Sequence, residues 1–156
     1  MPQDRISGRV ADEWGRDTAR QIASRIGATL KRPASNEATL DGKRVVIKCA
    51  APNTDSVGVT YRMLENLDSI MGAFQLEDGS FELWELSPAH FRSGMRPTRS
   101  RGAAAGKVGL VRRDTFVKHG KLYRRVRLDA VLQRGDKPDA ALAGAFRAAA
   151  SSQKTR

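Results

Sequence analysis

Residues 35–50, with the sequence SNEATLDGKRVVIKCA, decide the fold. Two β-prone runs, 37–40 and 43–49, lie on either side of Asp41-Gly42, and an Asp-Gly pair in this setting is a strong signal for a tight hairpin turn. The residues from Val45 to Ile47 form a continuous apolar run, which is typical of a strand buried on both faces. We therefore expect a β-hairpin whose second strand lies inside a sheet.

A helix precedes this hairpin. Apolar residues between Ala19 and Ile26 follow the spacing i, i+3, i+4, i+7, which is the period of one helix face. We expect the helix to span residues 12–26 and to end at Gly27, with residues 1–11 frayed.

The sequence after the hairpin predicts further helices and strands. We expect a loop over 52–58, a helix over 61–71, strands over 72–76 and 80–86 around a turn at 77–79, a loop over 91–109, two short strand segments within 110–128, and a helix over 139–150. The chain is thus expected to form one α/β domain over residues 1–128, followed by a C-terminal helix and a disordered tail over 129–156.

Composition narrows the class of protein. The chain has 156 residues, of which 40% are apolar and 29% charged, an ordinary globular balance. It contains no apolar stretch of transmembrane length, and its first residues lack the order of a signal peptide. The single cysteine, Cys49, excludes an intramolecular disulfide and a multi-cysteine zinc site. These features predict a cytoplasmic protein with no membrane contact.

Positive charge is concentrated in one segment. The net charge is +11, and residues 92–127 hold twelve Lys and Arg against the single acid Asp114, so this basic block alone accounts for the excess. Residues 63–91, just before it, hold six acids and no Lys or Arg. Such segregation favours contact with a polyanion, and we predict nucleic acid. The candidate nucleic-acid contacts are Arg96, Arg99, Arg101, Lys107, Arg112, Arg113, Lys118, Lys121, Arg124 and Arg125.

The hairpin itself carries candidate chemistry. Glu37 begins one strand and Lys48 ends the next, so the turn brings both to the same edge. A carboxylate there can hold a divalent cation, and a lysine can stabilise charge that develops on a phosphate. The competing interpretation is an exposed Glu and an exposed Lys without a role.

The order of a helix, the hairpin LDGKRVVIKCA, a second helix and a strand pair ending in FELWELSP resembles the core of the PD-(D/E)XK nuclease superfamily, over residues 12–91. The resemblance implies a restriction-endonuclease-like core, a central mixed β-sheet flanked by helices, to which this chain adds a basic C-terminal extension. It also implies a Mg²⁺- or Mn²⁺-dependent endonuclease acting on double-stranded DNA. Glu37 matches the first acid of the motif, with Asn36 in place of proline, and Lys48 matches the lysine.

Val46 departs from that pattern, because it stands where the family has its second acid. One explanation is that another element supplies the carboxylate. We rank Glu13 first, Asp17 second and Glu65 third, which makes Glu37 and Glu13 the expected metal ligands and these two with Lys48 the expected catalytic residues. The other explanation is a degenerate site on a fold that only binds nucleic acid.

Three hypotheses about function follow. The first is a metal-dependent endonuclease, and the second is a catalytically degenerate nucleic-acid-binding protein on the same fold. The third is a basic protein that assembles with an acidic partner, for which segment 63–91 of a second copy, in a homodimer, is one candidate.

Overall fold

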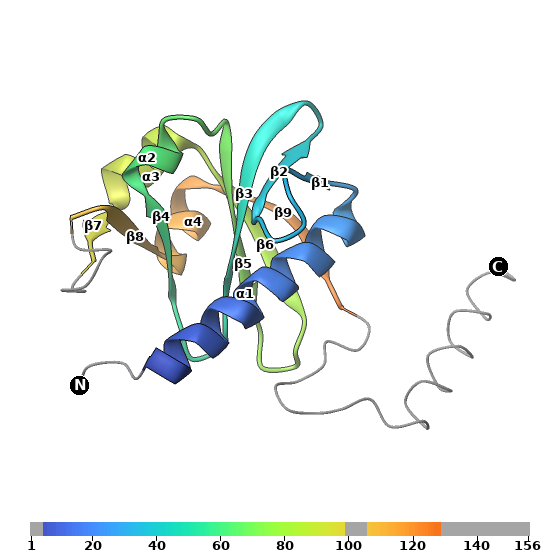
Figure 1. The fold of residues 1–156 in the computed structure, drawn as a ribbon. Helices are drawn as coiled ribbons and strands as arrows, with labels where there is room; N and C mark the ends of the chain where they lie inside the picture. Colours follow the sequence, from blue (N-terminus) through green and yellow to red (C-terminus); the bar gives the residue numbers. More distant parts are fainter. Residues whose placement is uncertain (1–4, 99–105, 129–156) are drawn as a thin grey trace, which may run out of the picture.

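A computed structural model describes residues 5–98 and 106–128 (Figure 1). Their architecture is α/β, with a mixed six-stranded sheet of strand order β1-β2-β3-β5-β6-β9 and a three-stranded sheet of order β4-β8-β7. The described part of the chain contains four helices. None of these helices is long and apolar enough to cross a membrane.

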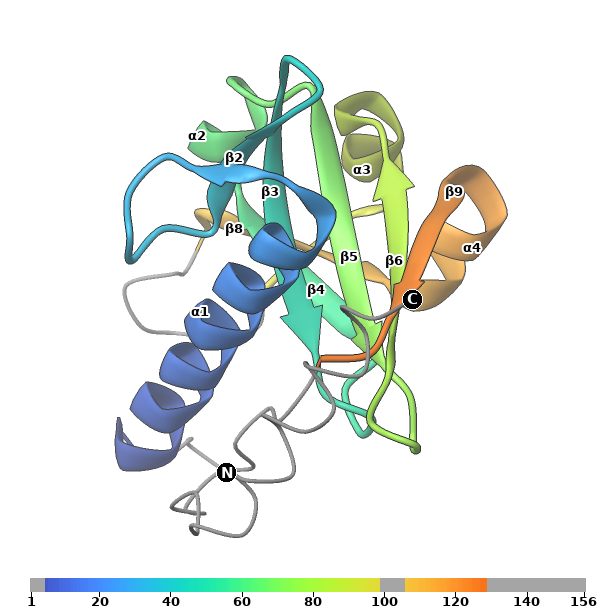
Figure 2. The same cartoon turned by 90° about the vertical axis from the view of Figure 1, so that its right-hand side faces the viewer.

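The central sheet has an apolar core on each face. One core packs helix α1 against side chains such as Val45 and Ile47, and the other packs Val46 against the second sheet and helices α3 and α4. Figure 2 shows α1 on one side of the sheet and α3 and α4 on the other. A mixed sheet covered on both faces, as expected from the sequence, is thereby confirmed.

Helix α1 spans Arg5–Ile26, which is longer than expected. The prediction that residues 5–11 are frayed is wrong, because no proline interrupts them and each added residue gains a hydrogen bond once the helix is nucleated. The helix ends where expected: Gly27 has a φ of +77°, a left-handed conformation that glycine adopts without steric cost.

The hairpin forms where its sequence predicts it. Strand β1 is Thr29–Leu30, β2 is Glu37–Leu40 and β3 is Lys43–Ala50. Asp41 and Gly42 both have positive φ, at 52° and 77°, as a two-residue type I′ turn requires. The Val45–Ile47 run is at most 2% exposed, so the expected burial on both faces is confirmed.

The expected helix over 61–71 is wrong for most of its length. Helix α2 is only Tyr61–Leu64, and Ser69–Gln75 forms strand β5, which pairs in parallel with β3 and antiparallel with β6, Phe81–Leu86. The side chains of β5 are buried without a break up to its last residue. A run that is apolar on both faces carries no period that separates a helix from a central strand.

The expected loops at 52–58 and 91–109 are interrupted by regular structure. Strand β4 is Ser56–Thr60, α3 is Pro88–Gly94, β7 is Arg96–Pro97, and β8 is Val108–Arg112. Among the described strands, β4 pairs only with β8, about fifty residues away, so it has no neighbouring strand in the sequence that would predict it. Helix α4, Arg113–His119, and edge strand β9, Lys121–Val126, complete the described chain. The helix expected over 139–150 lies outside the described residues.

Candidate functional site

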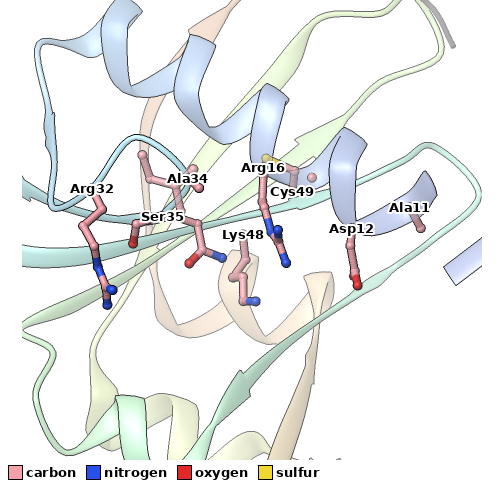
Figure 3. Close-up of a pocket in the computed structure, with 11 residues that line it drawn as sticks. Ala11, Asp12, Arg16, Arg32, Ala34, Ser35, Lys48 and Cys49 are labelled. Atoms are coloured by element: carbon pink, nitrogen blue, oxygen red, sulfur yellow. The ribbon is translucent and has the colours of Figure 1, made fainter. Parts of the chain in front are cut away.

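A cavity opens at the end of the β2–β3 pair, where strand β3 continues beyond the last residues that pair with it. The last contact of this pair is the amide of Ile47, which donates a hydrogen bond to the backbone oxygen of Asn36 over 2.8 Å, and β3 then continues to Ala50. The N-terminal half of α1 and the segment 32–36 surround this open edge and enclose about 530 Å³ (Figure 3). We call this space the α1–β3 cavity; its polar lining includes Asp12, Arg16, Arg32, Ser35, Asn36 and Lys48.

Helix α1 brings polar side chains to the cavity because of its own periodicity. Asp12 precedes Ala19 by seven residues, and Ala19 precedes Ile26 by seven, so the three share one helix face. Ala19 and Ile26 are buried in the core, whereas Asp12 and Arg16 line the cavity. The sheet-facing side of α1 therefore changes from apolar to polar along its length.

Cations dominate the cavity. Arg16, Arg32 and Lys48 come from three different segments of the chain, and Asp12 is the one carboxylate among the described residues that line this space. Burial lowers the pKa of Lys48; the nearby charge of Arg16 acts in the same direction, whereas Asp12 partly opposes it. The arrangement suits an anion that is bound by several charged donors at once.

The neighbouring thiol is not a nucleophile at neutral pH. Burial raises the pKa of Cys49 to about 12, with a smaller opposing effect from Lys48. Cys49 packs against the α1 side of the core. It therefore serves as a small apolar side chain in the cavity wall.

Glu37 does not line the α1–β3 cavity. Its carboxylate forms an ion pair with Lys31 over 3.2 Å. Lys31 lies beside it because β1 and β2 pair here, with the Lys31 amide donating to the Glu37 carbonyl. The structure thus does not bring the expected pair Glu37 and Lys48 into one cavity.

The other candidate carboxylates lie elsewhere. Glu13 and Asp17 line a second cavity along α1, of about 390 Å³, together with Arg16 and Arg20. Glu65 caps the C-terminus of α2 and lines neither cavity. Asp12, absent from the sequence ranking, is the acid that α1 places beside Lys48.

The donor set does not fit the expected magnesium or manganese ion. Across residues 5–98 and 106–128 no three His, Cys, Asp or Glu side chains gather as a metal-binding group. Mg²⁺ takes oxygen ligands and is usually held by one or two carboxylates with substrate phosphates. Among the described residues that line the α1–β3 cavity, Asp12 is the one carboxylate beside three cations, a donor set that disfavours a divalent metal ion.

Much of the basic block is already paired within the chain. Arg113 and Arg125 both contact the carboxylate of Glu82, which is 5% exposed. The other contacts are Arg112 with Asp55, Arg127 with Asp78, and Arg96 with the hydroxyl of Ser56. Part of the acidic segment 63–91 therefore neutralises arginines of its own chain.

The remaining candidates of the basic block fall into two groups. Lys107, Lys118, Lys121 and Arg124 are exposed, and none forms an ion pair with another described residue. Arg99 and Arg101 lie outside the described residues. The exposed group supplies positive charge just before β8, on α4 and on β9.

Comparison with known proteins adds no assignment. No family model matches this chain, and no curated protein matches its sequence.

Proposed function

We propose that this protein binds nucleic acid through its phosphates and that the α1–β3 cavity holds one phosphate group. The observation that carries the proposal is that Arg16, Arg32 and Lys48 line one concave site. A guanidinium presents a planar fork of donors that matches phosphate oxygens, and an ammonium adds a compact charge. With Asp12 included, the four side chains have a net formal charge of +2.

The exposed lysines and arginine of the basic block support the same function. Lys107, Lys118, Lys121 and Arg124 are free of ion pairs with described residues, so they are available to displace counterions from a nucleic-acid backbone. Charge of this kind contributes affinity that does not depend on sequence and falls steeply with salt.

The experiment is a titration of labelled duplex DNA, single-stranded DNA and RNA at several salt concentrations. Arg16→Ala, Arg32→Ala and Lys48→Ala should each weaken binding, and a variant that no longer neutralises one phosphate should have a log–log salt slope shallower by about 0.9 on duplex DNA. The control is Arg62→Ala, because Arg62 is exposed on α2 and lines neither cavity.

A second set of variants separates the cavity from the basic block. Replacing Lys118, Lys121 and Arg124 together by Ala should lower affinity without removing the effect of the cavity variants. We leave Arg113 intact, because its contact with buried Glu82 makes it part of the folded structure. Unchanged affinity in all the cavity variants would contradict the assignment of the cavity.

Cleavage of the bound strand is a second candidate function, favoured by Asp12 and Lys48 lining the same cavity. An ammonium can stabilise charge on a phosphate under attack, and a carboxylate can orient a water molecule. The test is incubation of supercoiled plasmid with Mg²⁺, with Mn²⁺ and with EDTA. If the protein cuts DNA, Asp12→Asn and Lys48→Ala should abolish cleavage, whereas metal-supported cleavage that survives both changes would place the reaction elsewhere.

A further inference from the structure

The charge of the α1–β3 cavity exceeds that of an internal phosphodiester. Arg16, Arg32 and Lys48 outnumber Asp12 by two formal charges. A phosphodiester carries one negative charge, whereas a phosphate monoester at neutral pH carries between about 1.5 and 2, because its second pKa is near 6. A terminal phosphate matches the cavity and an internal one leaves it positively charged.

The size of the cavity points to more than a bare phosphate. Its volume of about 530 Å³ is within the range of about 300–1,000 Å³ that holds small organic ligands. Ser35 and Asn36 add neutral polar groups to the lining. The Ser35 hydroxyl oxygen accepts a hydrogen bond from the Glu37 amide over 3.0 Å. The proton of the hydroxyl is therefore available to a ligand.

The open edge of β3 adds a main-chain donor. Backbone groups alternate in direction along a strand, so the Cys49 amide points to the same side as the Ile47 amide, which donates to Asn36. The register of β2 ends with Glu37 opposite Val46, and none of its residues lies opposite Cys49. The amide of Cys49 therefore faces the cavity, where an oxyanion is a suitable acceptor.

We propose that the α1–β3 cavity recognises the phosphorylated end of a nucleic-acid strand and not an internal phosphodiester. The proposal rests on the proposed function and names its ligand. Arg16, Arg32 and Lys48 bind the terminal phosphate together with the Cys49 amide, and the remaining volume takes the terminal nucleotide.

The experiment compares labelled oligonucleotides of one sequence that carry a 5′-phosphate, a 3′-phosphate or no terminal phosphate, with a circular strand that has no end. One phosphorylated form should bind about tenfold more tightly than the unphosphorylated form, as expected for an added charge-assisted contact. Arg32→Ala and Lys48→Met should remove this preference, and Arg62→Ala should retain it. Thermal unfolding of each variant shows that it is folded.

The possible failures are distinguishable. Equal binding of all four strands, weakened equally by the cavity variants, overturns the strand-end assignment and leaves phosphodiester binding in place. If both cavity variants keep the preference for the phosphorylated strand, the strand end binds outside the cavity. This result also overturns the proposal. Binding of inorganic phosphate or a nucleoside monophosphate without binding of any oligonucleotide overturns both the strand-end assignment and the proposed function.

Discussion

Glu37 lies directly opposite Val46 across the β2–β3 pair, so their side chains share one face of the sheet. Val46 is fully buried in the core that contains Ile70 and Phe116. Val46→Glu, which would restore the motif of the resembled family, therefore places an unpaired carboxylate in an apolar core. We expect it to lower the free energy of unfolding by at least about 3 kcal/mol, measured by urea denaturation.

Thr39→Glu is the matched control for this change. Thr39 is exposed on the same hairpin, so a carboxylate there should alter stability by no more than about 0.5 kcal/mol. A Val46→Glu protein as stable as the parent, with new metal-dependent cleavage, would show that this face opens to a metal ion after all.

Glu82→Ala should be among the most damaging single substitutions in the second half of the chain. Its carboxylate is buried and contacts Arg113 and Arg125, so its removal leaves guanidinium groups without their counter-charge. We expect the free energy of unfolding to fall by about 1.5–3 kcal/mol, the range for hydrogen bonds to a charged group, measured by urea denaturation. Asp78→Ala breaks the exposed pair with Arg127 and should cost less than about 1 kcal/mol; equal effects of the two substitutions would contradict this account.

Lys48 should make stability depend on pH in the alkaline range. Because burial lowers its pKa from the ordinary 10.5, the unfolded chain binds more protons than the folded chain between the two values. The contribution of Lys48 to the free energy of unfolding should rise with pH through that window, whereas the raised pKa of Cys49 contributes a fall above about pH 9, so the two are separated by comparing the parent with Lys48→Met. Lys48→Met should stabilise the protein at neutral pH and remove this rise, measured by urea titrations between pH 7 and pH 10.5.

Lys43→Met provides the comparison for Lys48, since Lys43 is exposed at the start of the same strand. Its pH profile should follow that of the parent. Parallel pH profiles for the parent and Lys48→Met would mean that burial does not shift the pKa of Lys48.

Cys49 should react slowly with thiol reagents while the protein is folded. A pKa of about 12 leaves fewer than about one thousandth as many thiolates at pH 8 as an ordinary cysteine has. The rate of labelling, measured by absorbance, should increase strongly in denaturing urea. A Thr39→Cys, Cys49→Ala protein, with its thiol exposed, should react rapidly without urea; rapid labelling of native Cys49 would contradict the expected burial.

Local signals make part of this fold predictable. The Asp41-Gly42 turn specifies its own φ values and pairs strands that adjoin it, so the sequence predicts the hairpin with its bounds nearly unchanged. Strand β4 pairs with β8 across about fifty residues, and such a distant pairing gives no local sequence signal. The apolar run of strand β5 has no period of its own, and for that reason the sequence predicts a helix where the strand begins.

The candidate site is predictable in part. Lys48 is identified from the end of its strand, and it lines the cavity. The predicted roles of Glu13, Glu37 and the basic block remain predictions. The seven-residue spacing from Ile26 through Ala19 reaches Asp12, so helix periodicity alone identifies the acid that faces the sheet. Arg32 has no such signal, because segment 32–36 is positioned by the strands on either side of it.

The sheet-facing side of α1 is polar near its N-terminus and apolar near its C-terminus, and this division has a consequence for how the protein can evolve. Ala19, Ile22 and Ile26 anchor the helix in the core, whereas Asp12 and Arg16 make up its part of the cavity wall. Substitutions at Asp12 and Arg16 can alter the cavity wall without loosening the packing of Ala19, Ile22 and Ile26, so selection can act on the cavity and on folding separately. A designer who wants to alter the proposed phosphate site can begin with these two positions.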